Sequence, residues 1–158
     1  MFLDTRQHTL LETLPARSFA TLMELYESNY ILLRRLAPEL HDMHGDHVST
    51  VSGTVDLHLG VLEQAPYTTS ASLTHFFPNA DAQGAQPGLL VRVYHDARVA
   101  EVMPETPVEQ FDLWAGQKPE PKSLEWRWEL NRFMNRWLRY CLGEGHEFVA
   151  DYAHRETG

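Results

Sequence analysis

The feature that most constrains the fold is residues 89–103, LLVRVYHDARVAEVM, where apolar and polar residues alternate on both sides of a short polar break. Two alternating runs facing each other across such a break are typical of a β-hairpin. If residues 96–97 are the central turn, Arg92 faces Glu101 as an ion pair on one side of the hairpin. The other side is then apolar and consists of Val91, Val93, Ala100 and Val102. Asp-Ala lacks the glycine of the strongest two-residue turns.

Length and composition limit the class of protein. The chain has 158 residues, which predicts one domain with a core that needs neither disulfides nor metals. Its formal net charge of −9 argues against nucleic acids and anionic membrane surfaces as partners. With Cys141 as its single cysteine, the chain forms no internal disulfide. Because no apolar run is long enough to cross a bilayer and residues 1–15 do not resemble a secretory signal, we expect a cytoplasmic protein without membrane partners.

Hydrophobic periodicity predicts a helix at each end and strands between them. Apolar residues at three- and four-residue spacing predict helices over about 18–36, with Ser18 as N-cap, and over 124–142, which ends at Gly143. Strand signals cover 48–51, 55–62 and 67–77, followed by the hairpin. Residues 38–47 and 78–88 are rich in polar residues, proline and glycine and are predicted as loops.

This order of elements predicts an α+β fold. About five antiparallel strands form a twisted sheet, and the N-terminal and C-terminal helices pack on one face of it. The domain is expected to span residues 18–145. It follows a poorly patterned lead-in over 1–17 and precedes a C-terminal tail over 146–158.

Four segments resemble a known family. They are the hairpin VRVYHDARVAEV, the upstream LGVLEQAPYTT, LMELYESNYILLRRLAP in the first helix and NRFMNRWLRYCLGEG in the last. Together they are similar to the YqiB-like proteins, bacterial domains of unknown function, over roughly Phe19 to Gly145. The resemblance implies membership of this family, which has no assigned activity. It also implies that the gene often lies near genes for nucleotide-hydrolysing enzymes.

The hairpin carries the main candidate binding residues. Charged and polar groups gather within one turn of chain: Arg92, Tyr94, His95, Asp96, Arg98 and Glu101. Guanidinium and imidazole groups there are suited to an anionic ligand or the charged groups of a protein partner. The structural alternative, which we favour, is a turn capped by Asp96 with a cross-strand Arg92–Glu101 pair.

A second candidate group precedes the third strand. Glu63 and Tyr67, with Thr68 and Thr69, offer a carboxylate and hydroxyls to a polar ligand. The alternative is a strand entrance in which threonine serves β-propensity. Arginines at 34, 35, 132, 136 and 139 form an anion-binding patch if the two helices lie side by side, or otherwise solvated faces with pairs such as Arg132 and Glu129.

Histidines recur every third residue in the first predicted loop. His41, His44 and His47 have ligand types that suit zinc and other first-row metals. A solvated loop does not hold ligands in place, so we expect no metal site there and no cofactor.

The motifs favour binding over catalysis. The sequence contains no glycine-rich phosphate loop, GxSxG, HExxH or CxxC motif. We therefore expect a non-catalytic module that binds a protein partner or a small anionic ligand. The alternative is a small enzyme or sensor for a phosphorylated or nucleotide-type metabolite, motivated by the charged hairpin group. The oligomeric state does not follow from the sequence.

Overall fold

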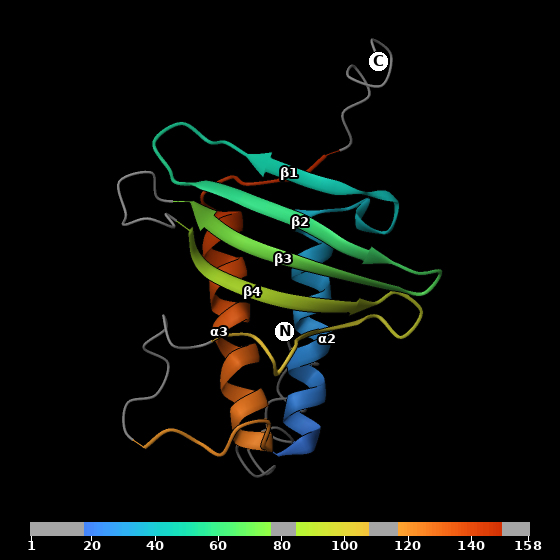
Figure 1. Cartoon of the computed structure of the whole chain (residues 1–158), viewed down its shortest axis with the longest axis vertical. Coiled ribbons are helices and arrows are strands. Elements are labelled where there is room, and N and C mark those ends of the chain that lie inside the picture. The colour runs from blue at the N-terminus through green and yellow to red at the C-terminus, as the bar shows by residue number, and fades with distance from the viewer. Residues whose placement is uncertain (1–17, 77–84, 108–116, 150–158) are drawn as a thin grey trace, which may run out of the picture.

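The computed structural model describes residues 18–76, 85–107 and 117–149, and it confirms the predicted α+β architecture. The elements are α2 (Phe19–Leu36), the 3-10 helix η1 (Leu40–Asp42), β1 (Gly45–Ser49), β2 (Asp56–Gln64), β3 (Thr68–Phe76), β4 (Ala85–Tyr94), β5 (Val99–Val102) and α3 (Leu124–Gly143). The five strands form one antiparallel sheet in the order β1-β2-β3-β4-β5. Both long helices lie side by side on one face of this sheet (Figure 1).

The two helices begin where capping chemistry predicts. The Ser18 side chain accepts a hydrogen bond from the backbone N–H of Thr21, and Ser123 does the same for Trp126. Each serine therefore satisfies a backbone donor that the first helical turn leaves without a partner. After α3 the chain turns through Gly145, whose φ of +96° is a conformation that L side chains rarely adopt.

The core lies between the sheet and the helices. Alternate residues of β2 to β5 face the helices and are buried, and they include Leu57, Leu59, Ala71, Leu73, Leu89, Val91, Val93, Ala100 and Val102. Leu33 and Leu36 of α2 and Leu130, Met134 and Leu138 of α3 pack against them. The period of two in the strands and the helical period therefore converge on one apolar layer.

The hairpin has the predicted register but a wider loop. Arg92 pairs with Glu101, and the last paired residues are Tyr94 and Val99. The backbone N–H of Arg98 donates to the carbonyl of Tyr94 at 2.8 Å, and Arg98 has a φ of 57°. The loop thus comprises residues 95–98 rather than a tight turn at 96–97, because Asp-Ala does not favour the positive φ angles that a two-residue turn needs.

Two strands begin earlier than the sequence suggests. β1 starts at Gly45, which has a φ of +74°, so that His47 is a strand residue rather than part of a loop. β4 starts at Ala85 inside the predicted loop over 78–88. In both cases pairing with a neighbouring strand, β2 or β3, extends the strand beyond its local propensity.

The predicted lead-in and most of the predicted tail, residues 1–17 and 150–158, lie outside the described residues. Of the tail residues that are described, His146 and Phe148 are buried, whereas Val149 is exposed. The backbone N–H of Phe148 donates to the carbonyl of Leu36 at 2.7 Å. Neither long helix in the described part of the chain is apolar enough to cross a membrane.

A chain of asparagines links the helices to the edge of the sheet. Asn135 Nδ2 donates to Asn29 Oδ1 at 2.9 Å, and Asn29 Nδ2 donates to Asn131 Oδ1 at 3.3 Å. Asn131 Oδ1 also accepts the backbone N–H of Val102 at 2.8 Å. Because β5 is an edge strand, this bond satisfies a donor that would otherwise be open to pairing with another chain.

Candidate functional site

The predicted hairpin group is divided between the two faces of the sheet. Arg92, Tyr94 and Glu101 lie on the face away from the helices. The Tyr94 hydroxyl donates to Glu101 Oε1 at 3.1 Å, so it joins the end of β4 to β5 on this face. Burial, and next the Glu101 carboxylate, raise the pKa of Tyr26 in α2 to about 12, against an opposing effect of Arg127. Glu101 thus lies on the outer face of the edge strand β5, close enough to α2 to affect Tyr26.

The remaining candidates lie at the tips of two neighbouring hairpins. Asp96, Arg98 and Tyr67 are exposed at these tips, and Glu63 is exposed beside a register shift in β2. The backbone N–H of His95 donates to the carbonyl of Tyr67 at 2.8 Å, which ties the two tips together. The structure thus brings Tyr67, His95, Asp96 and Arg98 to one end of the sheet, while Arg92 and Glu101 lie on its outer face.

At this end a hollow opens between α2, η1 and the end of β4. Its empty volume of about 230 Å³ includes open solvent, so the hollow is a shallow surface site that suits a single chemical group rather than a whole cofactor. Apolar side chains line it in part: Leu33, Ala37, Leu40 and Val93. The polar lining consists of Tyr30, Arg34, His41 and His95.

Arg34 and His41 are positioned by their own elements. Arg34 Nη1 donates to the Tyr30 hydroxyl at 3.0 Å, one helical turn away, and its guanidinium lies 5.9 Å from the centre of the Tyr30 ring. His41 stands edge-on to His95, with ring centroids 5.7 Å apart, and its Nε2 lies 3.3 Å from Asp42 Oδ2. The hollow therefore gathers one fixed cation and two imidazoles.

Hydrogen bonds of the Thr69 and Gln64 side chains determine which ring nitrogen of neutral His95 carries the proton. Gln64 Nε2 donates to the carbonyls of Leu40 and Met43, both at 2.7 Å, so Gln64 Oε1 is left to accept the Thr69 hydroxyl at 2.6 Å. The Thr69 oxygen must then accept from His95 Nε2, which lies 2.7 Å away. Neutral His95 is thus held as the Nε2–H tautomer, with Nδ1 free of the proton.

The surroundings of His95 favour its neutral form. Burial, and next the nearby His41 and Arg34, lower the pKa of His95 below its ordinary value of 6.5, against a smaller opposing effect of Asp96. A titratable group with a lowered pKa beside an arginine in a hollow is a feature of binding and catalytic sites.

Sequence reasoning singled out His95 but not the residues around it. In the sequence, Arg34 belongs to the group of helix arginines and His41 to the loop histidines, so neither is paired with His95. No local motif joins them, because they come from α2, η1 and the loop that follows β4 and meet only in the folded chain.

The loop histidines do not converge. His47 Nε2 bonds the carbonyl of His44 at 2.8 Å, and His41 points toward His95. Over the described ranges, the group of side chains with metal-ligand spacing is His75, Glu144 and His146. It lies at the other end of β3 from Thr69 and was not singled out by the sequence.

The other helix arginines have the contacts expected of solvated faces. Arg132 Nη1 lies 3.8 Å from Glu129 Oε1, and its guanidinium lies 6.0 Å from the centre of the Trp128 ring. Arg139 Nε donates to Asn135 Oδ1 at 2.9 Å. These contacts leave Arg34 as the arginine that lines the hollow.

Comparison with known proteins supports the resemblance found in the sequence. The family model "Protein of unknown function (DUF1249)" matches residues 32–147. Proteins named "Uncharacterized protein YqiB", from Escherichia coli strain K12 and Escherichia coli O157:H7, are 36% identical to this chain over 137 residues. The match covers 85% of this chain and 95% of each relative. No solved structure matches.

Proposed function

The chain belongs to the DUF1249 family of YqiB-like proteins, and we propose that it is a binding module that holds an anionic group, a carboxylate or a phosphate, in the hollow between Arg34, His41 and His95. The observation that carries this proposal is a hydrogen-bonded relay of Gln64, Thr69 and His95. In this relay Gln64 Oε1 accepts from the Thr69 hydroxyl, and the Thr69 oxygen accepts from His95 Nε2. The relay holds the imidazole of His95 in one orientation beside a guanidinium.

Charge supports an anion as the occupant. Arg34 keeps its positive charge at any physiological pH, and the two histidines add charge when they are protonated. In a chain with a formal net charge of −9, such a local concentration of positive charge favours one anionic group over broad binding to polyanions. The apolar lining beneath it lowers the local dielectric and strengthens a charge-assisted hydrogen bond.

The lining favours binding over covalent chemistry. Among the residues that the structure describes around the hollow there is no serine, cysteine or carboxylate to act as a nucleophile. One observation favours the alternative of a small enzyme for a phosphorylated metabolite: Nδ1 of neutral His95 is free of the proton and can act as a general base. Turnover of a nucleoside monophosphate during the titrations below would identify that alternative.

A cytoplasmic location is part of the proposal. The single cysteine, Cys141, is fully buried, and burial raises the pKa of its thiol to about 12. Such a thiol is protonated and inert, which suits a reducing compartment.

Replacing Arg34 with glutamine should weaken binding of an anion about tenfold, because one charge-assisted hydrogen bond is worth roughly 1.5 kcal/mol or more. Calorimetric titration with inorganic phosphate, succinate, adenosine monophosphate and an acidic peptide measures the effect. Tighter binding of the peptide than of the small anions would identify a protein partner as the source of the group, and the reverse would identify a metabolite.

The matched control is Arg35→Gln. Arg35 is also exposed in the last turn of α2 but does not line the hollow, so this variant should bind like the wild type. An equal loss of anion affinity in both variants would mean that the effect comes from the change in net charge. It would refute the hollow as the binding site.

Anion binding should tighten as the pH falls from 8 to 5.5, by about three- to tenfold, as His95 gains charge beside the bound anion. Because the pKa of His95 is lowered from 6.5, this gain should appear below that pH rather than above it. The His95→Gln variant, titrated over the same pH range, should lack the increase in anion affinity below pH 6.5. A wild-type affinity that does not change with pH would contradict the assignment of the histidines.

A further inference from the structure

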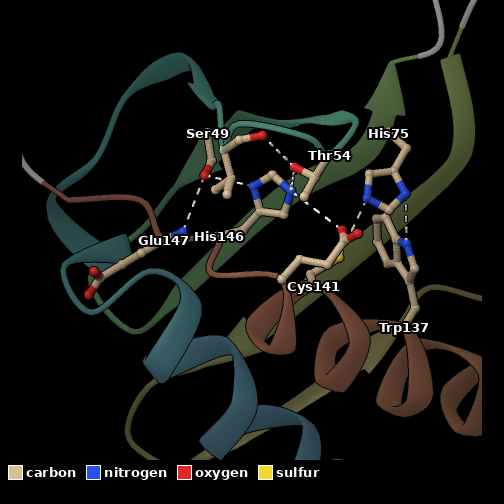
Figure 2. Close-up of polar contacts among 9 residues, drawn as sticks. Ser49, Thr54, His75, Trp137, Cys141, His146 and Glu147 are labelled. Atoms are coloured by element: carbon tan, nitrogen blue, oxygen red, sulfur yellow. Dashed lines mark hydrogen bonds and ion pairs between the residues drawn. The ribbon is translucent and has the colours of Figure 1, made fainter.

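A second cluster of functional side chains lies at the other end of the sheet from the hollow. His75 comes from β3, and Glu144 and His146 from the segment that follows α3. One ligand atom from each lies within 4.8 Å of the others, and His146 Nε2 is 3.7 Å from Glu144 Oε1. His75 and His146 are 6% and 2% exposed, whereas Glu144 is partly exposed, so the cluster lies at the border of the core and solvent. Figure 2 shows the two imidazoles with Ser49, Thr54 and Trp137 around them.

We propose that His75, Glu144 and His146 form a binding site for a divalent first-row metal ion, with Zn²⁺ as the ion that fits best. Two imidazoles and one carboxylate are a donor set that zinc uses in proteins. Ligand atoms of a tetrahedral zinc ion lie about 3.4 Å apart, since each is about 2.1 Å from the metal. The 3.7 Å between His146 and Glu144 is already close to that spacing.

The surroundings of His146 suit a metal ligand. Its Nδ1 lies 2.9 Å from Ser49 Oγ, and this oxygen also accepts the backbone N–H of Glu147 at 3.2 Å (Figure 2). With a metal on Nε2, the ring proton moves to Nδ1 and donates to Ser49 Oγ. An imidazole that binds through one nitrogen and donates from the other to a fixed acceptor is the usual arrangement around bound metals.

In the absence of metal the proton lies on the other nitrogen. The Thr54 hydroxyl donates to the carbonyl of Val51 at 2.8 Å, so its oxygen accepts from His146 Nε2, 3.3 Å away. The imidazole therefore exchanges one tautomer for the other, and the bond to Ser49 is kept.

A hydrogen bond from Trp137 to His75 opposes metal binding. Trp137 Nε1, which can only donate, gives its hydrogen to His75 Nδ1 at 3.1 Å (Figure 2). This bond favours the tautomer of His75 with the proton on Nε2, the nitrogen that faces the cluster. A metal must displace that proton to Nδ1 and separate the imidazole from the indole N–H, so Trp137 competes with the metal.

A bound metal ion would link the sheet to the segment that follows α3. His75 belongs to the sheet, whereas Glu144 and His146 belong to the segment that returns from α3 toward β1. One ion joining them fixes that segment to the sheet. Cys141 Sγ, 3.7 Å from His75 Nε2, lies next to the site but is not among the three ligands.

The test is competition of the chelator-treated full-length protein with a chromogenic zinc chelator, with Zn²⁺ as the only added ion. We expect one zinc ion per chain, and at least about tenfold weaker binding in Glu144→Gln and in His146→Gln. Trp137→Phe should bind zinc about five- to tenfold more tightly than the wild type, the factor that one ordinary hydrogen bond represents. Zinc should raise the melting temperature of the wild type and not that of His146→Gln.

Two controls separate this site from other effects. Trp126→Phe removes an indole N–H that donates to the carbonyl of Pro104 at 3.4 Å, and it should leave zinc affinity unchanged. The triple variant His41→Ala, His44→Ala, His47→Ala should also bind one zinc ion as the wild type does. Wild-type protein without bound zinc, zinc binding that survives in both ligand variants, or Trp137→Phe that binds no more tightly than the wild type would each overturn the proposal.

Discussion

Replacing Asn131 with alanine should lower the free energy of unfolding by about 3 kcal/mol, a large loss for one side chain. Its amide is fully buried between α3, α2 and β5. Asn131 Oδ1 accepts from the backbone of Val102 at 2.8 Å and from Asn29 Nδ2 at 3.3 Å, and Nδ2 donates to the carbonyl of Arg127 at 2.7 Å.

The cost is large because the substitution leaves two buried donors without an acceptor. The Val102 N–H lies at the edge of the sheet beneath α3, and Asn29 is fully buried. An unsatisfied buried polar group costs about 1–3 kcal/mol, and the small cavity left by the amide adds to it.

Urea unfolding, followed by tryptophan fluorescence, measures this loss. Arg136→Ala, at an exposed position of the same helix, should change stability by less than about 0.5 kcal/mol and serves as control. A loss below about 1 kcal/mol for Asn131→Ala would mean that water replaces the asparagine, and the account of β5 given above would fail.

The contrast between Arg92 and Asn131 shows which parts of the fold can be predicted from sequence. The pairing of Arg92 with Glu101 follows from local alternation, and the structure has that register. The bonds of Asn131 depend on two elements about 30 and 100 residues away, and an asparagine in an amphipathic helix has no pattern that names its partners. Secondary-structure propensity and hydrophobic periodicity therefore predict the helices and strands and which of their faces is buried. Polar contacts between elements follow only from how the elements pack.

The candidate site shows the same limit. Alternation along residues 92–95 already separates Arg92 and Tyr94 from His95, so the division of the charged hairpin group can be predicted from the sequence. That His95 meets Arg34 could not be predicted, since this contact depends on how α2 crosses the sheet. Likewise, His75 and His146 are separated by most of the β4–α3 region and share no motif spacing.

Replacing Thr69 with valine should damage both stability and binding, because the Thr69 hydroxyl is the central link of the relay. It donates to Gln64 Oε1 at 2.6 Å and accepts from His95 Nε2 at 2.7 Å, and the side chain is fully buried. Valine has nearly the same shape, so the change removes the hydroxyl without opening a cavity. We expect a loss of about 2 kcal/mol in the free energy of unfolding, since one acceptor and one donor lose their partner.

The same variant should weaken anion binding about tenfold. Without Thr69 Oγ1, nothing in the relay holds the proton of His95 on Nε2 or fixes the orientation of its ring. The imidazole then samples other rotamers and tautomers, and the cost of ordering it is added to each binding event. The nitrogen chemical shifts of His95 in ¹⁵N-labelled protein should show the Nε2–H tautomer in the wild type and a mixture in Thr69→Val.

Two neighbouring substitutions separate the relay from general damage. Thr69→Ser keeps the hydroxyl and should keep most of the binding, with a modest loss of stability from the missing methyl group. Thr68→Val changes the adjacent residue, whose side chain lies on the opposite face of the sheet, and should leave binding unchanged. If Thr69→Val binds phosphate and the acidic peptide as tightly as Thr69→Ser does, His95 does not need the relay, and the hollow is a surface feature rather than a binding site.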